Sequence, residues 1–385
     1  MTSLPLGFTS YVANIGIKDA SRDFTLVAAE TEVAAAGVFT KSRFAGPSVE
    51  VSRRHLADHR ARAIVVISKN ANVANGPNGL AHAEEIVTRV AERLGCLPSD
   101  VVIASTGVIG RPYPMDRIRS GLAKIPFPLP DDDAGAVAEG IMTTDTVPKI
   151  AEAAIEGTAA RVVGVAKGVG MIEPDMATLI TLVLTDAEIE PRALDAIWRR
   201  VIDRTFNCVS VDSDTSTSDS AVVLASGRAG PVDATAFELA LEDVCLSLTK
   251  QVARDGEGAE KLIEVRVDHA RDGEQAKTVA KSIVNSPLVK TAIHGADPNW
   301  GRVAMAIGKC SQYSDIDQDA VIIRFGDQEV YPHPVDESGL DALSRYMRGT
   351  DIVIHVSLMT GQAACTVWGC DLTDGYIRIN ADYTT

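Results

Sequence analysis

A threonine stands where a constrained turn meets a long apolar run. Residues 167–184 read KGVGMIEPDMATLITLVL, with Gly168, Gly170 and Pro174 in the approach and an aliphatic and β-branched run from Thr178 onward. An apolar run of this length without polar alternation predicts a strand that is buried on both faces. Thr178 would be held by this strand on one side and be reachable on the other, as a nucleophile requires. The simpler interpretation is a packed strand residue, because threonine favours strands.

A second junction of this kind follows the apolar residues 101–104. The chain there continues into Ser105, Thr106 and Gly107, and the glycine would leave its backbone N–H open to a ligand. On these residues alone, an ordinary turn is the simpler interpretation.

The segment before Thr178 resembles the self-cleavage site of the ornithine acetyltransferase family, the glutamate N-acetyltransferases. In that family a lysine-glycine-x-glycine-methionine run leads to Met-Ala-Thr, and the bond before the threonine is broken autocatalytically. Further segments agree with the family in order, over nearly the whole chain. The resemblance implies a layered α/β sandwich that cleaves itself between Ala177 and Thr178. The products would be an α chain of residues 1–177 and a β chain of residues 178–385.

The resemblance also implies the chemistry. The acetyl group of N-acetylornithine would pass to glutamate through an acetyl-threonine intermediate on Thr178, with no cofactor and no metal. Cleavage would free the α-amine of Thr178, which would act as the base for the hydroxyl of the same residue. Thr106 and Gly107 would form the oxyanion hole, where the loss of one donor typically costs about 10²- to 10³-fold in rate.

Substrate-binding residues are implied by the same resemblance. They are Thr143, Thr144, Lys167, Thr178, Glu257, Asn380 and Thr385. Lys167 and Glu257 would bind the carboxylate and ammonium groups of the substrates, since opposite charges recognise each other well at a partly desolvated site. A surface role for Glu257, which lies between two glycines, is the simpler interpretation without the family. Which of the two threonines contacts substrate is left open.

Two segments have the outline of a metal site. His55 and His59 are four residues apart in a segment that predicts a charged helix, but arginines surround them, so we expect a solvated helix face. The acidic run DSDTSTSDS at residues 212–220 fails the EF-hand pattern, because Thr217 occupies position six and Val223 position twelve. We expect this run to be a hydrogen-bonded structural loop near the site.

The remaining patterns predict the elements that position these residues. Residues 23–40 predict paired strands, and an asparagine-rich loop at residues 69–79 is expected to form a wall of the site. Thr235 and the glutamate three residues later predict a capping box that opens a long helix. Residues 294–302 predict a loop between helices, with His294 packed or at the edge of the pocket.

Composition limits the possible partners and the compartment. The 385-residue chain carries a formal net charge of −15, which disfavours nucleic acid and leaves small molecules or other protein chains. No apolar run approaches the ~18 to 20 residues of a membrane span, so no membrane partner is expected. The scattered cysteines indicate neither a zinc site nor a disulfide framework, and they fit a reducing cytoplasm. They are Cys96, Cys208, Cys245, Cys310, Cys365 and Cys370.

Two departures from the common family pattern are informative. The common arginine-biosynthetic members tend to carry asparagine where this chain has Asp175, and their asparagine-rich loop differs. In both places the chain is more similar to the members associated with clavulanic acid biosynthesis. The family would also suggest paired αβ units, (αβ)2 or higher. Two rival functions remain: an N-terminal-nucleophile amidase or aminopeptidase, and a non-catalytic amino-acid-binding protein.

Overall fold

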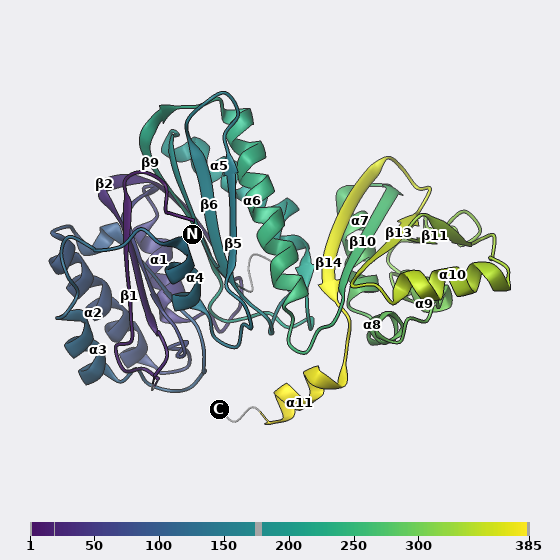
Figure 1. Cartoon of the computed structure of the whole chain (residues 1–385), viewed down its shortest axis with the longest axis horizontal. Coiled ribbons are helices and arrows are strands. Elements are labelled where there is room, and N and C mark those ends of the chain that lie inside the picture. The colour runs from purple at the N-terminus through teal and green to yellow at the C-terminus, as the bar shows by residue number, and fades with distance from the viewer. Residues whose placement is uncertain (1, 19, 174–178, 383–385) are drawn as a thin grey trace.

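The computed structural model describes residues 2–18, 20–173 and 179–382. Two β-sheets organise this part of the chain, and helices cover their outer faces (Figure 1). Eight strands form one sheet and six form the other, and β8 of the second sheet precedes β9 of the first along the chain. The layered α/β fold expected from the sequence is therefore confirmed.

The eight-stranded sheet has the strand order β4-β3-β2-β9-β7-β6-β5, with β1 beside β2. Its strands are β1 (Phe8–Ala13), β2 (Phe24–Phe39), β3 (Arg60–Ile67), β4 (Val101–Ser105), β5 (Lys149–Ala154), β6 (Arg161–Lys167), β7 (Ile180–Glu188) and β9 (Ser220–Pro231). The apolar run after Thr178 is β7, and it is buried from Ile180 to Ala187, as its lack of polar alternation predicts.

Strand β2 corrects one expectation. Residues 23–40 form one 16-residue strand rather than a pair of strands, with an irregular register against β3 between Ala28 and Val33. Only Glu30, Thr31 and Glu32 of this strand are exposed. Such a short polar break makes a bulge and not a turn, and a bulge bends the strand. The first half of β2 pairs with β1 and the second half with β9.

The two arms of the bent sheet enclose a shared apolar core. Val66 of β3 and Val102 of β4 belong to the same buried cluster as Val165 of β6, Leu182 of β7 and Val222 of β9. The strands thus form two layers with apolar side chains between them. Helices α2 (Pro77–Leu94) and α3 (Met115–Leu122) cover the outer face of one arm, and α5 (Pro191–Arg204) and α6 (Ala234–Arg254) cover the other.

Two shorter helices complete this part of the fold. Helix α1 (Pro47–His55) contacts β4, and α4 (Ala134–Ile141) contacts β1, β2 and β6. Helix α1 ends at His55, while His59 lies in the turn beyond it with a φ of 61°. The expectation that both histidines share one helix is therefore wrong.

The start of α6 corrects a second expectation. The helix is capped by Asp233, whose side chain accepts hydrogen bonds from the backbone N–H groups of Thr235 and Ala236. Because the carboxylate of Asp233, two residues earlier, occupies the N-cap position, the threonine has no capping role. Glu238, the expected partner in a capping box, instead forms ion pairs with Arg200 and another arginine of α5.

The six-stranded sheet has the order β12-β11-β13-β10-β14-β8. Its strands are β8 (Val209–Ser210), β10 (Leu262–Ala270), β11 (Ile322–Phe325), β12 (Gln328–Tyr331), β13 (Asp351–Ser357) and β14 (Ala363–Cys370). Its helices are α7 (Gly273–Val284), α8 (Pro287–His294), α9 (Trp300–Gly308) and α10 (Glu337–Met347). The expected loop between helices is thus present but shorter, because α8 includes His294 and α9 begins at Trp300.

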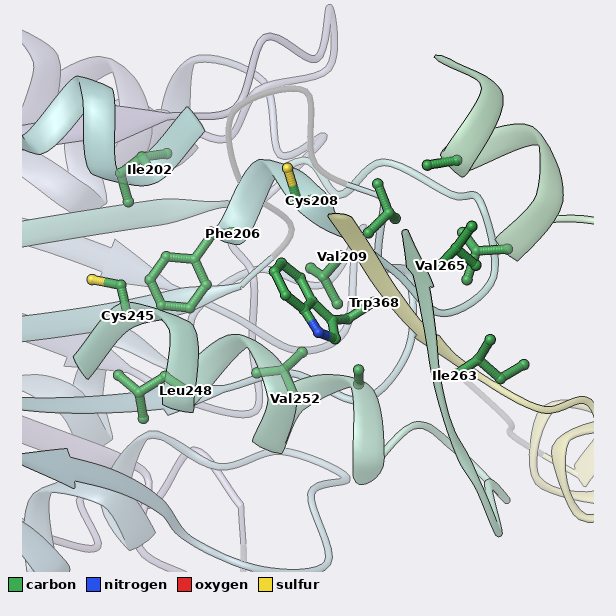
Figure 2. Packing of buried hydrophobic residues seen from close by; sticks show 14 of the residues in the cluster. Ile202, Phe206, Cys208, Val209, Cys245, Leu248, Val252, Ile263, Val265 and Trp368 are labelled. Carbon is green, nitrogen blue, oxygen red and sulfur yellow. The ribbon is translucent and has the colours of Figure 1, made fainter. Parts of the chain in front are cut away.

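Helix α6 joins the two sheets through a continuous core. Figure 2 shows Leu248 and Val252 of α6 beside Phe206, with Val209 of β8 and Trp368 of β14 next to them. The last helix, α11 (Asp374–Asp382), leaves the second sheet and extends below the junction of the two sheets (Figure 1). Among the described helices, none is long and apolar enough to cross a membrane.

Candidate active site

A cavity of about 310 Å³ lies where β4, β6, β7 and β9 meet their adjoining loops. Seven of the residues expected at the site line it: Thr106, Gly107, Thr143, Thr144, Lys167, Glu257 and Asn380. They come from five separate segments of the chain. The fold therefore brings together residues that lie up to 274 positions apart, as the numbers 106 and 380 show.

Three expected residues lie outside the described part of the chain. They are Ala177 and Thr178, on the two sides of the expected cleavage, and Thr385. Leu179, the neighbour of Thr178, lines the cavity, and its carbonyl accepts a hydrogen bond of 3.0 Å from the backbone N–H of Ser220. The chain that continues from Thr178 is therefore fixed at the cavity wall.

The turn after β4 forms a second wall. Gly107 has a φ of +128°, and a Cβ at this position would lie 2.2 Å from the backbone carbon of Lys69. Only glycine fits here, because both its backbone conformation and the closely approaching backbone at Lys69 exclude a side chain. The backbone N–H of Thr106 already donates to Ile67, so the group that Thr106 can offer at the cavity is its hydroxyl.

Lys167, at the end of β6, places a cation in the cavity wall. Its Nζ donates a hydrogen bond of 3.1 Å to Oγ1 of Thr143. Burial lowers the pKa of Lys167, and the negative charge of Asp145 opposes this effect only in part. An ammonium group in such surroundings favours a ligand that supplies a negative charge.

Glu257 places a carboxylate in another part of the wall. Its oxygens accept hydrogen bonds of 3.0 Å each from Oγ1 of Thr144 and Nδ2 of Asn380, and its backbone N–H donates to the carbonyl of Val169. A Cβ on Gly170 would lie 2.6 Å from this carboxylate, so the glycine makes room for it. Hydrogen bonds with three separate segments therefore hold the partly buried Glu257 at the cavity wall.

The two threonines have separate partners. Thr143 contacts the cationic side chain, and Thr144 contacts the anionic one. The cavity thus presents one positive and one negative group, each fixed by a hydroxyl. A ligand with both a carboxylate and an ammonium group matches this arrangement.

A buried ion-pair network supports the cation. Nζ of Lys149 lies 2.7 Å from Asp145 and 2.5 Å from Asp255, and the lysine side chain is fully buried. Burial alone would raise the pKa of Asp145, but the ammonium groups of Lys167 and Lys149 outweigh burial and hold this pKa below its usual value. Asp145 also accepts hydrogen bonds from the backbone N–H groups of Thr143 and Gly168. Asp145 therefore fixes the backbone beside Lys167 as well as the backbone of Thr143, the hydrogen-bond partner of Lys167.

The acidic run at residues 212–220 has two parts. Asp212 accepts hydrogen bonds of 2.7 Å from the backbone N–H groups of Met171 and Ile172, which is the structural role expected for this run. Asp219, by contrast, lines the cavity, and its side-chain Oδ2 has no hydrogen-bond partner among the described residues. Burial raises the pKa of Asp219 well above its ordinary value.

Asp219 was missed as a site residue by the sequence reasoning. The sequence signal that could have identified Asp219 was its position directly before a buried strand. Lys69 belongs to the asparagine-rich loop, and its Nζ donates a 2.5 Å hydrogen bond to the carbonyl of Met142. Ala71 of the same loop lines the cavity, so the loop borders the site as expected.

His294 does not line the cavity. Its Nδ1 lies 3.1 Å from Oδ2 of the buried Asp371, which explains it as a packed histidine on α8. Glu260 is the third member of this cluster, and one ligand atom of each residue lies within 4.8 Å of the others. None of these three residues lines the cavity.

Comparison with known proteins gives a consistent match over the whole chain. The ArgJ family model matches residues 9–385. Arginine biosynthesis bifunctional protein ArgJ 2 of Nostoc is 53% identical over 384 residues, which cover 100% of this chain and 99% of that relative. Glutamate N-acetyltransferase Oat2 of Streptomyces clavuligerus is also 53% identical, over 99% of this chain and 98% of the relative.

One solved structure is similar at lower coverage. The crystal structure of arginine biosynthesis bifunctional protein ArgJ from Bacillus halodurans is 41% identical and covers 51% of this chain and 96% of its own, with a TM-score of 0.49.

Proposed function

The chain belongs to the ArgJ family, and we propose that it transfers the acetyl group of N-acetylornithine to glutamate through an acetyl-threonine on Thr178. The relatives named above are a bifunctional arginine-biosynthetic protein and a glutamate N-acetyltransferase, and both match this chain over nearly its full length. Glutamate N-acetyltransferase activity in arginine biosynthesis is the function that accounts for this similarity.

One observation carries the proposal. The residue after Thr178 lines the same cavity as the side chains of Lys167 and Glu257 and the turn at Thr106 and Gly107. A nucleophile, a pair of oxyanion donors and two charged anchors are the groups that acyl transfer between amino acids needs. The convergence of the expected oxyanion donors and charged anchors on the cavity that Leu179 also lines supports an enzyme over a surface binding module.

The proposed mechanism begins with cleavage between Ala177 and Thr178. The freed α-amine takes the proton of the Thr178 hydroxyl, and the Oγ attacks the acetyl carbonyl of N-acetylornithine. The hydroxyl of Thr106 and the N–H of Gly107 bind the oxyanion, and ornithine leaves. Glutamate then attacks the acetyl-threonine, and N-acetylglutamate is released.

The charged groups position both substrates in turn. The ammonium of Lys167 binds the α-carboxylate that ornithine and glutamate share, and Glu257 binds the side-chain ammonium of the donor. Asn380 fixes the carboxylate of Glu257, and Thr385 supplies a further substrate contact.

The assembly and setting complete the proposal. Residues 1–177 and 178–385 would remain together as an α and a β chain, since β6 and β7 pair along their length across the cleavage point. We propose paired αβ units in the cytoplasm. The residue Asp175 and the asparagine-rich loop also support a link to clavulanic acid biosynthesis. The test is to introduce this gene into an arginine auxotroph that lacks the acetyltransferase. Growth of that strain without arginine would contradict an exclusive role in clavulanic acid biosynthesis.

The first test is an intact-mass spectrum of the purified protein beside Thr178→Ala. We expect two chains in the wild type, the second starting at Thr178, and one full-length chain in the variant. A single full-length chain in both proteins would remove the base from the mechanism and favour an amino-acid-binding protein.

An assay with N-acetylornithine separates the transferase from a hydrolase. We expect added glutamate to be converted to N-acetylglutamate in step with ornithine release. Ornithine release with free acetate, at a rate that glutamate does not change, would instead indicate an N-terminal-nucleophile amidase.

A further inference from the structure

Two cysteines face each other on the six-stranded sheet, away from the cavity described above. Cys208 ends the 3-10 helix η2 (Phe206–Cys208), and Cys365 lies on β14. Their sulfur atoms are 3.9 Å apart. A disulfide holds its sulfurs at about 2.05 Å, so a modest rotation of the side chains would bring these two into bonding distance.

Backbone pairing between β8 and β14 holds the segments that carry this pair of cysteines close together. Strands β8 and β14 pair in parallel, with Val209 opposite Trp368, so the cysteines sit on neighbouring segments of one sheet. Figure 2 shows Cys208 next to these two residues at the edge of the core. Closing a bond here needs no rearrangement of distant parts of the fold.

A cation and a thiol donor favour one of the two thiols for reaction. The Cys208 thiol lies within hydrogen-bond distance of the Cys365 sulfur, and this contact together with the nearby Lys277 ammonium holds the pKa of Cys365 below its ordinary value. The same contact, followed by burial, raises the pKa of Cys208. The Lys277 ammonium is itself held by Asp203, at 2.8 Å. Cys365 is thus the nucleophile and Cys208 the resolving thiol.

The pair is open to small reagents. Both cysteines line a surface cavity of about 670 Å³, together with Lys277 and Asp203. Cys208 is buried at 2% exposure, while Cys365 is partly exposed. A small oxidant can therefore reach the more reactive sulfur directly.

We propose that Cys208 and Cys365 form a redox-active dithiol that a peroxide closes to a disulfide. The thiolate of Cys365 attacks one oxygen of hydrogen peroxide, the O–O bond breaks, and the hydroxide that leaves takes up a proton to give water. The sulfur of Cys208 then attacks the resulting sulfenic acid, the S–O bond breaks, and hydroxide leaves with the thiol proton as a second water. Two thiols are oxidised by two electrons, and one peroxide is reduced to two waters.

The site borders a segment that shapes the cavity. Four residues beyond Cys208, Asp212 holds the backbone N–H groups of Met171 and Ile172, and Met171 lines the cavity. A bond between Cys208 and Cys365 would fix the start of β8, which ends two residues before this carboxylate. The inference does not depend on the proposed acetyl transfer, because both cysteines lie outside the residues assigned to it.

The test is peptide mapping after brief treatment of the full-length protein with hydrogen peroxide. We expect the mass of the chain that carries both cysteines to fall by about 2 Da, with one cross-linked peptide that joins Cys208 to Cys365 and separates on reduction. The matched control is Cys96→Ser, which removes another partly exposed thiol and should leave the cross-link unchanged. Cys365→Ser and Cys208→Ala should each abolish it.

Lys277→Met tests the assigned order of reaction. Loss of the ammonium should slow formation of the cross-link roughly tenfold at pH 7, because a nearby cation favours the reactive thiolate of Cys365. Far-UV circular dichroism would check that the variant is folded. Oxidation of the wild type to sulfinic acids without the cross-linked peptide, or an unchanged rate in folded Lys277→Met, would overturn the proposal.

Discussion

Glu257→Gln isolates the charge of the proposed ammonium anchor. The carboxylate accepts one hydrogen bond from Thr144 and one from Asn380, each at 3.0 Å. A glutamine of the same shape can accept from Asn380 through its oxygen and donate to Thr144 through its nitrogen, because a hydroxyl can rotate to accept. The substitution therefore keeps the architecture and removes the charge alone.

The expected loss follows from the burial of the group. A hydrogen bond to a charged partner contributes about 1.5 to 3 kcal/mol, and each 1.4 kcal/mol is about tenfold. The Glu257 side chain is only half-buried, so solvent screens part of its charge and the lower half of that range applies. We expect kcat/KM for N-acetylornithine to fall roughly 10- to 50-fold.

The assay compares two donors and two variants. The two donors are N-acetylornithine and N-acetylnorvaline, which lacks the side-chain ammonium. The two variants are Glu257→Gln and the control Glu260→Gln, which changes an exposed carboxylate three residues away that does not line the cavity. With N-acetylnorvaline the wild type and Glu257→Gln should have equal kcat/KM, and Glu260→Gln should behave as wild type with both donors. A loss of less than twofold with N-acetylornithine, or equal losses with both donors, would refute the role given to Glu257.

Four further predictions concern the cavity walls and the buried ion-pair network beside them. Gly107→Ala should abolish acetyl transfer in a steady-state assay, because its Cβ would lie 2.2 Å from the backbone of Lys69 at a φ of +128°; activity above a tenth of wild type would count against this wall. Lys149→Met should lower the free energy of unfolding by about 3 to 5 kcal/mol in urea titration, since it leaves Asp145 and its partner carboxylate buried without their cation. Because the pKa of Lys167 is lowered, its ammonium loses its proton at a lower pH than a free lysine does, and the affinity for carboxylate substrates should fall as pH rises through this pKa. A KM that stays constant between pH 7 and 10 would contradict the role of this ammonium. The effect of pH on stability has the opposite sign. Because the pKa of Lys167 is lower in the folded protein than in the unfolded chain, the unfolded chain binds more protons between these two pKa values, and the free energy of unfolding rises with pH in this interval. Lys167→Met should remove this pH dependence of stability.

The sequence by itself determined the local elements and the segments of the site. The unbroken apolar run after Thr178 predicted a buried strand, and β7 confirms it. The local order of polar residues around Lys167 and at Thr106 marked the right loops through a family resemblance. These inferences succeed because they depend on neighbours within a few residues along the chain.

Only the tertiary structure decided how those segments meet. No local pattern could show that the carboxylate of Glu257 accepts from Asn380, which lies 123 positions away, or that Asp219 faces the cavity while Asp212 holds a loop. The same limit applied to residues 23–40, which predict paired strands from their polar breaks, but pairing with neighbouring strands on both sides continues β2 as one strand through a bulge. Long-range hydrogen bonds and burial set these outcomes, because they depend on which distant segments pack together and on how much water that packing removes.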